Sequence, residues 1–166
     1  MAAVPEKVRQ CESIIGYEFA EKRHGIDALF AYSGSCRYMG SILAIKKNDT
    51  LGIFGDIVIQ DHLCRQWLAI GLSKGMRQWT QIRQQAASNS NLASIGKARG
   101  LDACVVLNPG TAEVTDSVMA TTVEAIIGAV SLDGGRAAAE KVMDRLNVTH
   151  ELLTPVKSKT LLPSWP

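Results

Sequence analysis

Several signals that would assign the chain to a specialised class are missing from its 166 residues. The N-terminus has no apolar run of the kind that begins a signal peptide, and no stretch reaches the ~18 apolar residues of a membrane span. The four cysteines are far apart, so the sequence contains no zinc or disulfide pattern. We therefore expect no membrane contact and an intracellular location. Because Glu6 and Glu12 argue against a mitochondrial presequence, we expect a cytoplasmic or nuclear location more than a mitochondrial one.

The net charge is small, but the charges are unevenly distributed along the chain. A formal net charge of +2 does not by itself indicate a nucleic-acid partner. Between Ile57 and Ala112, however, the only acids are Asp61 and Asp102, whereas the basic residues are Arg65, Lys74, Arg77, Arg83, Lys97 and Arg99. Such a stretch suits a polyanion, although a solvated helical face has the same composition.

Helix signals are strong and strand signals are weak, which predicts an all-α fold. We expect helices over residues 5–15, 25–32, 49–68, 73–86, 89–99, 118–132 and 136–146, with residues 33–40 as a loop and Asp133-Gly134-Gly135 as a break. Apolar residues make up 46% of the chain, enough to bury the core of one domain. The predicted domain covers residues 1–148, and a flexible tail covers residues 149–166.

Two glycines lie inside the predicted helix 49–68, where glycine is unfavourable, so their presence needs a structural explanation. Gly52 and Gly55 each cost ~1 kcal/mol relative to alanine in a helix interior. Close approach of a second helix is the usual reason, and Gly128 in the helix 118–132 fits the same contact. The apolar side of the helix 49–68 is marked by Leu51, Phe54, Val58 and Trp67.

Four segments, in a fixed order, carry the functional argument. They are IIGYEFAEKRHGIDAL (14–29), DTLGIFGDIV (49–58), IRQQAASNSNLASIGKARGLD (82–102) and MATTVEAIIGAVSLDGG (119–135). Together they resemble the ribonuclease III endonuclease domain family over about residues 14–146, and the last segment is the most specific. The resemblance implies that family's helical fold, cleavage of double-stranded RNA with Mg²⁺ or Mn²⁺, and a homodimer that forms a valley for the duplex. No segment resembles the separate double-stranded-RNA-binding domain that follows many members.

The resemblance also implies four metal-binding carboxylates, two on each of two helices. The corresponding positions hold Gly52, Asp56, Thr121 and Glu124. Mg²⁺ prefers oxygen ligands, and carboxylates one turn apart on a helix share a face. We therefore predict Asp56 and Glu124 as catalytic and metal-binding residues and Asp49 as a further catalytic candidate. Gly52 and Thr121 are degenerate catalytic positions, and Lys74, Arg77, Arg83 and Lys97 are the candidate RNA-binding residues.

The candidate residues have ordinary alternative roles. Glu124, on an otherwise apolar helix, could form a salt bridge in the core, and Asp49 could cap a helix.

Two remaining carboxylates should hold Mg²⁺ poorly, and loss of a metal ligand commonly costs several powers of ten in rate. Three functions stay open: an RNA-binding domain with weak or absent cleavage, an active minimal endoribonuclease in RNA processing, and a structural module in a ribonucleoprotein assembly.

Overall fold

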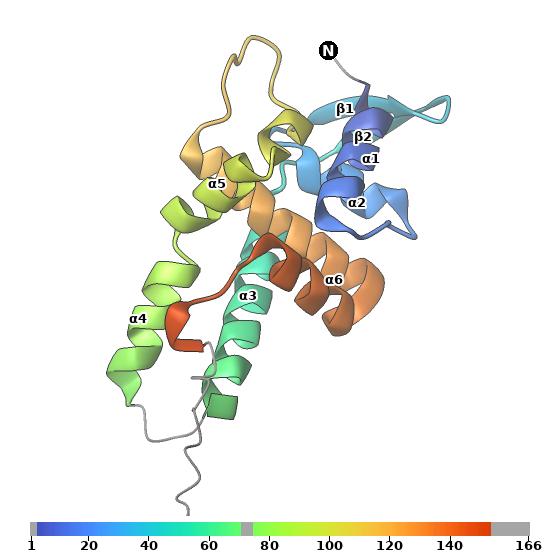
Figure 1. Cartoon of the computed structure of the whole chain (residues 1–166). Coiled ribbons are helices and arrows are strands. Elements are labelled where there is room, and N and C mark those ends of the chain that lie inside the picture. Colours follow the sequence, from blue (N-terminus) through green and yellow to red (C-terminus); the bar gives the residue numbers. More distant parts are fainter. Residues whose placement is uncertain (1–2, 71–74, 154–166) are drawn as a thin grey trace, which may run out of the picture.

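The computed structural model describes residues 3–70 and 75–153, and it is mostly α-helical, as the sequence predicts (Figure 1). In chain order the elements are α1 (Val4–Ile15), α2 (Lys22–Leu29), β1 (Gly34–Tyr38), β2 (Ser41–Ile45), α3 (Asp49–Ile70), α4 (Met76–Ala86), α5 (Asn89–Ala98), the 3-10 turn η1 (Leu101–Cys104), α6 (Asp116–Leu146) and the 3-10 turn η2 (Glu151–Leu153). Ser73, the predicted start of the fourth helix, lies outside the described residues, and α4 begins at Met76.

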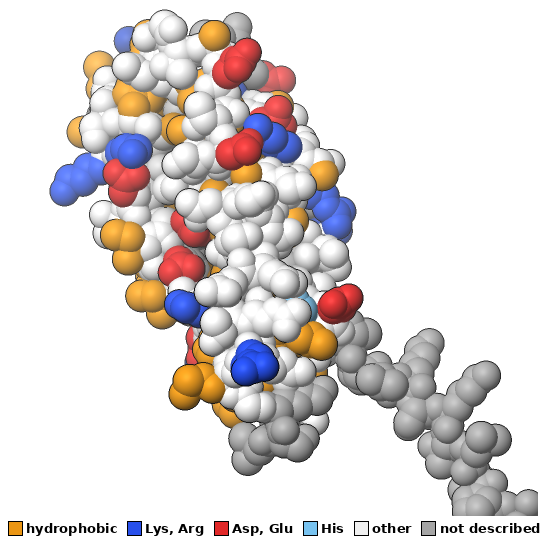
Figure 2. Space-filling view, turned by 90° about the vertical axis from the view of Figure 1, so that its left-hand side faces the viewer, with side chains coloured by type: hydrophobic (Ala, Val, Ile, Leu, Met, Phe, Trp, Pro, Cys, Tyr) orange, Lys and Arg blue, Asp and Glu red, His pale blue; other side chains and the backbone are white. Residues whose placement is uncertain are grey.

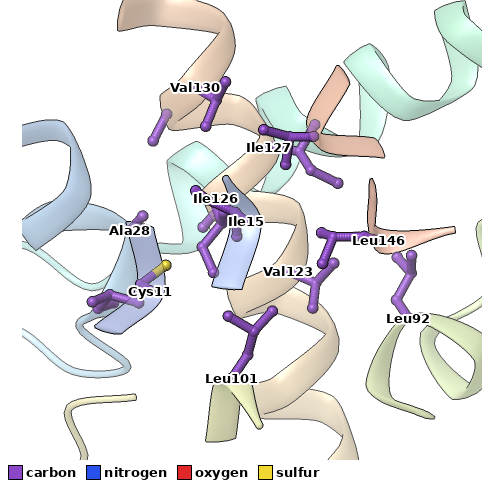
Figure 3. Packing of buried hydrophobic residues seen from close by; sticks show 14 of the residues in the cluster. Cys11, Ile15, Ala28, Leu92, Leu101, Val123, Ile126, Ile127, Val130 and Leu146 are labelled. Atoms are coloured by element: carbon purple, nitrogen blue, oxygen red, sulfur yellow. The ribbon is translucent and has the colours of Figure 1, made fainter. Parts of the chain in front are cut away.

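Helix α6 forms the centre of the hydrophobic core. Helices α1, α2, α3 and α5 all pack against it. Figure 3 shows α6 side chains such as Val123 and Ile126 among Ile15 of α1, Leu92 of α5 and Leu101 of η1. By length and hydropathy α6 would also pass as a membrane span, but 56% of its apolar window is buried inside the domain. That burial is what the central helix of a folded domain requires.

A break divides α6 where Asp133-Gly134-Gly135 predicts one. Gly135 has φ 76° and ψ −176°, a backbone conformation that favours glycine. Asp133 accepts hydrogen bonds from the Tyr17 hydroxyl (2.7 Å) and from the backbone N–H groups of Ala20 (2.7 Å) and Glu21 (2.9 Å). The carboxylate therefore fastens the segment before α2 to the break in α6.

Helices α3 and α6 touch through their backbones. A Cβ atom added at Gly55 would overlap the carbonyl oxygen of Glu124, and one added at Gly128 would lie 2.6 Å from the carbonyl oxygen of Leu51. The predicted close approach at the glycines is confirmed. The buried residues of α3 are Gly52, Gly55, Ile59, His62 and Leu63. The predicted apolar side was wrong in detail: Leu51, Phe54, Val58 and Trp67 are only half-buried, because they flank the glycine face rather than form it.

Residues 33–40, predicted as a loop, instead form part of an antiparallel hairpin of β1 and β2. Gly34 pairs with Ile45 and Tyr38 with Ser41. The turn consists of Met39 (φ 48°) and Gly40 (φ 82°), the left-handed conformations that suit a two-residue hairpin turn. The prediction failed because Met-Gly is a weak turn signal compared with Asn-Gly or Asp-Gly.

The bounds of α2 and of the C-terminal end also differ from the prediction, and α2 ends at Leu29 rather than at residue 32. Helix α2 begins at Lys22 rather than at residue 25, because the Glu21 side chain accepts a hydrogen bond from the N–H of Arg23 (3.2 Å). At the C-terminal end the domain passes residue 148. His150 is buried, its Nδ1 accepts a hydrogen bond from the N–H of Leu152 (3.1 Å), and its Nε2 lies 2.7 Å from Gln85 Oε1 of α4. Of the predicted tail 149–166, only residues 149–153 are described, and they pack on the domain.

Substitution of Gly55 by alanine tests the backbone contact. The added Cβ has no space beside the carbonyl of Glu124, so we expect Gly55→Ala to lower the free energy of unfolding by about 3 kcal/mol or more. Urea denaturation followed by circular dichroism measures this change. Gly75→Ala is the matched control, because nothing lies within 4 Å of the added Cβ at Gly75. Equal stabilities of the two variants would contradict the contact.

Candidate active-site depression

The crossing of α3 and α6 leaves an open depression of ≈290 Å³ at the surface. It is lined by Asp49, Gly52, Ile53, Asp56, Thr121 and Glu124. The α3 residues follow one another at helical spacing, and Thr121 and Glu124 lie one turn apart on α6. The structure thus brings together every catalytic and degenerate position that the sequence analysis singled out.

Asn48 is the residue just before α3, and it positions this end of the helix. It is 3% exposed, and its side-chain Nδ2 donates hydrogen bonds to the carbonyl oxygen of Ala28 (2.9 Å) and to Thr122 Oγ1 (3.4 Å). These bonds tie the first turn of α3 to α2 and α6. No sequence signal distinguishes this buried asparagine from an exposed one at a helix start, so only the fold identifies its role.

Glu124 is a half-buried carboxyl without a positively charged neighbour. None of the ion pairs among the described residues includes it. Burial, and secondarily the charge of Asp56, raises the pKa of Glu124 to about 7. Asp56 accepts a hydrogen bond from Gln60 Nε2 (2.7 Å). The alternative of a core salt bridge at Glu124 is therefore wrong, because the side chain faces the depression.

The two degenerate positions meet at the floor of the depression. A Cβ atom added at Gly52 would lie 3.0 Å from Thr121 Cγ2 and 3.6 Å from Glu124 Oε2. A side chain at position 52 would therefore enter the space beside Glu124. In this chain glycine provides no oxygen there, and Thr121 contributes a hydroxyl in place of a charged group.

The remaining donors fit a divalent metal ion poorly. Within residues 3–70 and 75–153, no three His, Cys, Asp or Glu side chains are arranged to hold a metal ion. Asp49 lies at the rim, where its Oδ1 is 2.8 Å from Lys47 Nζ. This leaves Asp56, Glu124 and the Thr121 hydroxyl. Mg²⁺ requires near-octahedral oxygen coordination, and this donor set supplies only part of it.

The predicted RNA-binding residues do not line the depression. Arg77 and Arg83 are exposed on α4, and Lys97 of α5 forms an ion pair with Asp116 (2.6 Å). Lys74 lies outside the described residues. Figure 2 shows the face that carries α4 and α5, where basic and acidic side chains are interspersed rather than gathered. The basic residues that are close together in the sequence therefore do not form one continuous basic patch on this face.

A larger hollow of ≈820 Å³ lies elsewhere, between α1 and the loop 105–114. Its lysines are already engaged: Lys7 Nζ donates to the carbonyl oxygens of Ala103 and Val105, and Lys97 is paired with Asp116. Because both lysines of the hollow are engaged by groups of the fold, the smaller depression is the better candidate for chemistry.

Comparison with known proteins identifies the family. The family model described as Ribonuclease-III-like matches residues 39–150, a range that includes every residue lining the depression. The chain belongs to the ribonuclease-III-like family. The resemblance found in the sequence motifs is therefore confirmed.

Individual relatives agree with this assignment. The chain is 28% identical over 136 residues to Ribonuclease 3 of Oleidesulfovibrio alaskensis, covering 80% of this chain and 58% of that protein. It is 28% identical over 148 residues to Ribonuclease 3 of Rhodopirellula baltica, covering 86% and 51%. The chain thus spans little more than half the length of these relatives.

A solved structure shares the fold. The nuclease domain of ribonuclease III from Campylobacter jejuni aligns with a TM-score of 0.71 and 20% identity, covering 84% of this chain and 94% of that one. The crossing of α3 and α6 is therefore part of a known nuclease-domain fold.

The pKa of Glu124 predicts a pH dependence of stability. Because the folded-state pKa (about 7) lies above the ordinary value of 4.5, folding favours the protonated carboxyl. That stabilisation is complete below the ordinary pKa and is lost as the pH rises through 7. Glu124→Gln keeps the shape and removes the titration. We expect its stability advantage over the wild type to grow between pH 5 and pH 8, by no more than about 2 kcal/mol for a half-buried group.

Thermal denaturation in chelator-treated buffer measures this difference. Glu113→Gln is the control, because Glu113 is exposed and lines the larger hollow rather than the depression. Parallel stability curves for Glu124→Gln and the wild type would show that Glu124 titrates as an ordinary glutamate.

Proposed function

We propose that this ribonuclease-III-like domain binds double-stranded or structured RNA and that its metal-dependent cleavage is weak or absent. The observation that carries the proposal is the incomplete donor set of the depression, with Gly52 and Thr121 beside Asp56 and Glu124. Family membership supports RNA as the ligand. The exposed Arg77 and Arg83 supply positive charge that a phosphate backbone would attract.

Asp56 and Glu124 are the residues proposed to face the RNA backbone. A bound Mg²⁺ or Mn²⁺ ion would neutralise phosphate charge and activate water. Asp56, Glu124 and the Thr121 hydroxyl are the groups placed to approach such an ion. Since they complete only part of its coordination shell, we expect metal binding to depend on oxygen atoms of the RNA.

Restoring the missing carboxylates tests the cause of the impairment. We expect the wild-type protein to leave long double-stranded RNA intact with Mg²⁺. Gly52→Glu combined with Thr121→Asp should raise cleavage at least about tenfold, because two carboxylates then join Asp56 and Glu124. The double change also removes the Thr121 methyl, which lies 3.0 Å from the new Cβ at position 52.

Gel analysis of RNA products with Mg²⁺ or Mn²⁺ measures the gain. The control is Gly52→Gln with Thr121→Asn, which has the same shape without the charges. Rapid cleavage by the wild type would refute the proposed impairment and favour an active minimal endoribonuclease. Absence of duplex binding would refute the RNA-binding function and favour a structural module.

We further propose that the domain forms a homodimer through an apolar face. Ile53 and Ile57 of α3 are 68% and 59% exposed, and Leu132 of α6 is 54% exposed. Phe54 lies between the two isoleucines in the sequence and lines a hollow with Ile57. The nuclease domain from Campylobacter jejuni has a structurally flexible region that is involved in dimer formation.

A charge placed on this apolar face tests the dimer. We expect Ile57→Asp to convert the protein to a monomer, because an unpaired carboxylate buried at an interface is unfavourable by several kcal/mol. Light scattering across a range of concentrations measures the mass. Leu68→Asp is the control, since Leu68 is 48% exposed on the same helix, more than two turns away. A wild-type monomer, or a dimer in Ile57→Asp, would contradict this interface.

A further inference from the structure

The β1–β2 hairpin has one face on the core and one face exposed to solvent. Cys36 and Ile45 are buried on the inner face. The outer face carries Ser35 and Arg37 opposite Ala44 and Ile42, and all four are exposed. The turn residue Met39 is 87% exposed. Figure 1 shows the turn extending past α1 at the top of the molecule. The hairpin therefore projects from the domain with an outer face that no element within residues 3–70 and 75–153 covers.

The charge of this hairpin has only one sign. Residues 28–48 contain no aspartate or glutamate, whereas Arg37, Lys46 and Lys47 are basic. Among the ion pairs of the described residues, Arg37 and Lys46 do not appear, and Lys47 pairs with Asp49. Two exposed cations beside an apolar turn suit a long anionic ligand. The cations would bind its charged groups, and the turn would contact the uncharged surface between them.

The hairpin is attached firmly to the rim of the depression. Strand β2 ends at Ile45, and Lys46 and Lys47 connect it to Asn48 and the first turn of α3. Arg23 Nη2 donates to the carbonyl oxygen of Ala44 (2.7 Å), and the N–H of Lys47 donates to Ser33 Oγ (3.1 Å). Lys47 Nζ lies 2.8 Å from Asp49, which lines the depression. We therefore expect a ligand that is longer than the depression to contact the hairpin as well.

The spacing of the cations fits a repeating polyanion. Arg37 lies opposite Ile42, and Lys46, the first residue after β2, follows Ile42 by four residues. At the rise of a strand, the two cations are separated by about 13 Å. Cations at this separation can contact separate phosphates, and the minor groove of an RNA duplex is wide and shallow enough to admit an exposed turn such as Met39-Gly40.

We propose that the β1–β2 hairpin is a second RNA-contacting element, in which Arg37 and Lys46 bind backbone phosphates of the duplex that crosses the depression and Met39 lies against its minor groove. This inference rests on the proposed RNA-binding function and adds to it the element that fixes the position of the duplex. An acidic protein is the competing ligand, but the continuity of the hairpin with the depression favours RNA.

The test compares Arg37→Ala/Lys46→Ala with the wild type by fluorescence anisotropy of a labelled RNA duplex at several salt concentrations. We expect affinity at low salt to fall about tenfold or more. The slope of log affinity against log salt should decrease by about 0.9 for each phosphate that the variant no longer binds. The control Arg9→Ala/Lys141→Ala removes the same charge from exposed positions on α1 and α6 and should keep the wild-type slope.

A second variant separates RNA binding at the turn from folding. Met39 has φ 48°, a conformation that glycine adopts more easily, so Met39→Gly should leave the melting temperature unchanged or raise it. We expect its duplex affinity to fall about threefold, because the variant has no apolar side chain at the turn. A stable Met39→Gly protein that binds duplex like the wild type would overturn the proposed role of the turn.

The outcomes separate this inference from the proposed function. If the wild type binds no duplex at any salt concentration, both fail. If the wild type binds duplex and Arg37→Ala/Lys46→Ala binds it with the same affinity and slope, only the hairpin inference fails. Polyglutamate of matched length provides the remaining comparison. A loss of binding seen with polyglutamate and not with duplex would assign the hairpin to an acidic protein and overturn the inference.

Discussion

The backbone contact between α3 and α6 is the constraint on which the rest of the structure depends. Two glycines, Gly55 and Gly128, remove the side chains that would hold the helices apart. Helix axes that come this close place Asp56 and Glu124 on the two sides of one depression. The same contact buries part of Glu124 and so produces its raised pKa. Packing and electrostatics at this site therefore have one cause.

The contact between α3 and α6 does not depend on the acidic residues of the depression. The helices are held by glycine, by apolar side chains of α6 and by Asn48, none of which carries metal-binding charge. Replacing a carboxylate in the depression removes charge repulsion between neighbouring acids and leaves this packing untouched. The stability of the fold and the presence of a complete metal site are thus separate properties of the domain, and selection can act on them independently.

Much of the helical core and most of the residues that line the depression could be predicted from the sequence. The hairpin and the distribution of charge on the surface could not. The motifs around Asp56 and Glu124 determine residue spacing on two helices, and helical spacing converts directly into a shared face. The glycines indicated the close approach of the helices because their cost in a helix needs compensation. For the hairpin, neither Met39-Gly40 nor the short strands give a strong local signal, so tertiary packing of Cys36 and Ile45 decides the structure. The ion pair between Lys97 and Asp116 could not be predicted either, because it depends on how α5 packs against α6.

The three hydrogen bonds to Asp133 have a consequence for the order in which the domain can assemble. They join Asp133 to Tyr17, Ala20 and Glu21, across 112 to 116 residues of sequence. On the ribosome, α1 and α2 emerge long before the α6 segment against which they pack. The apolar face of α2 stays uncovered until the α6 segment has been synthesised. The N-terminal third of the chain is therefore the part that chaperones have the longest time to bind during translation.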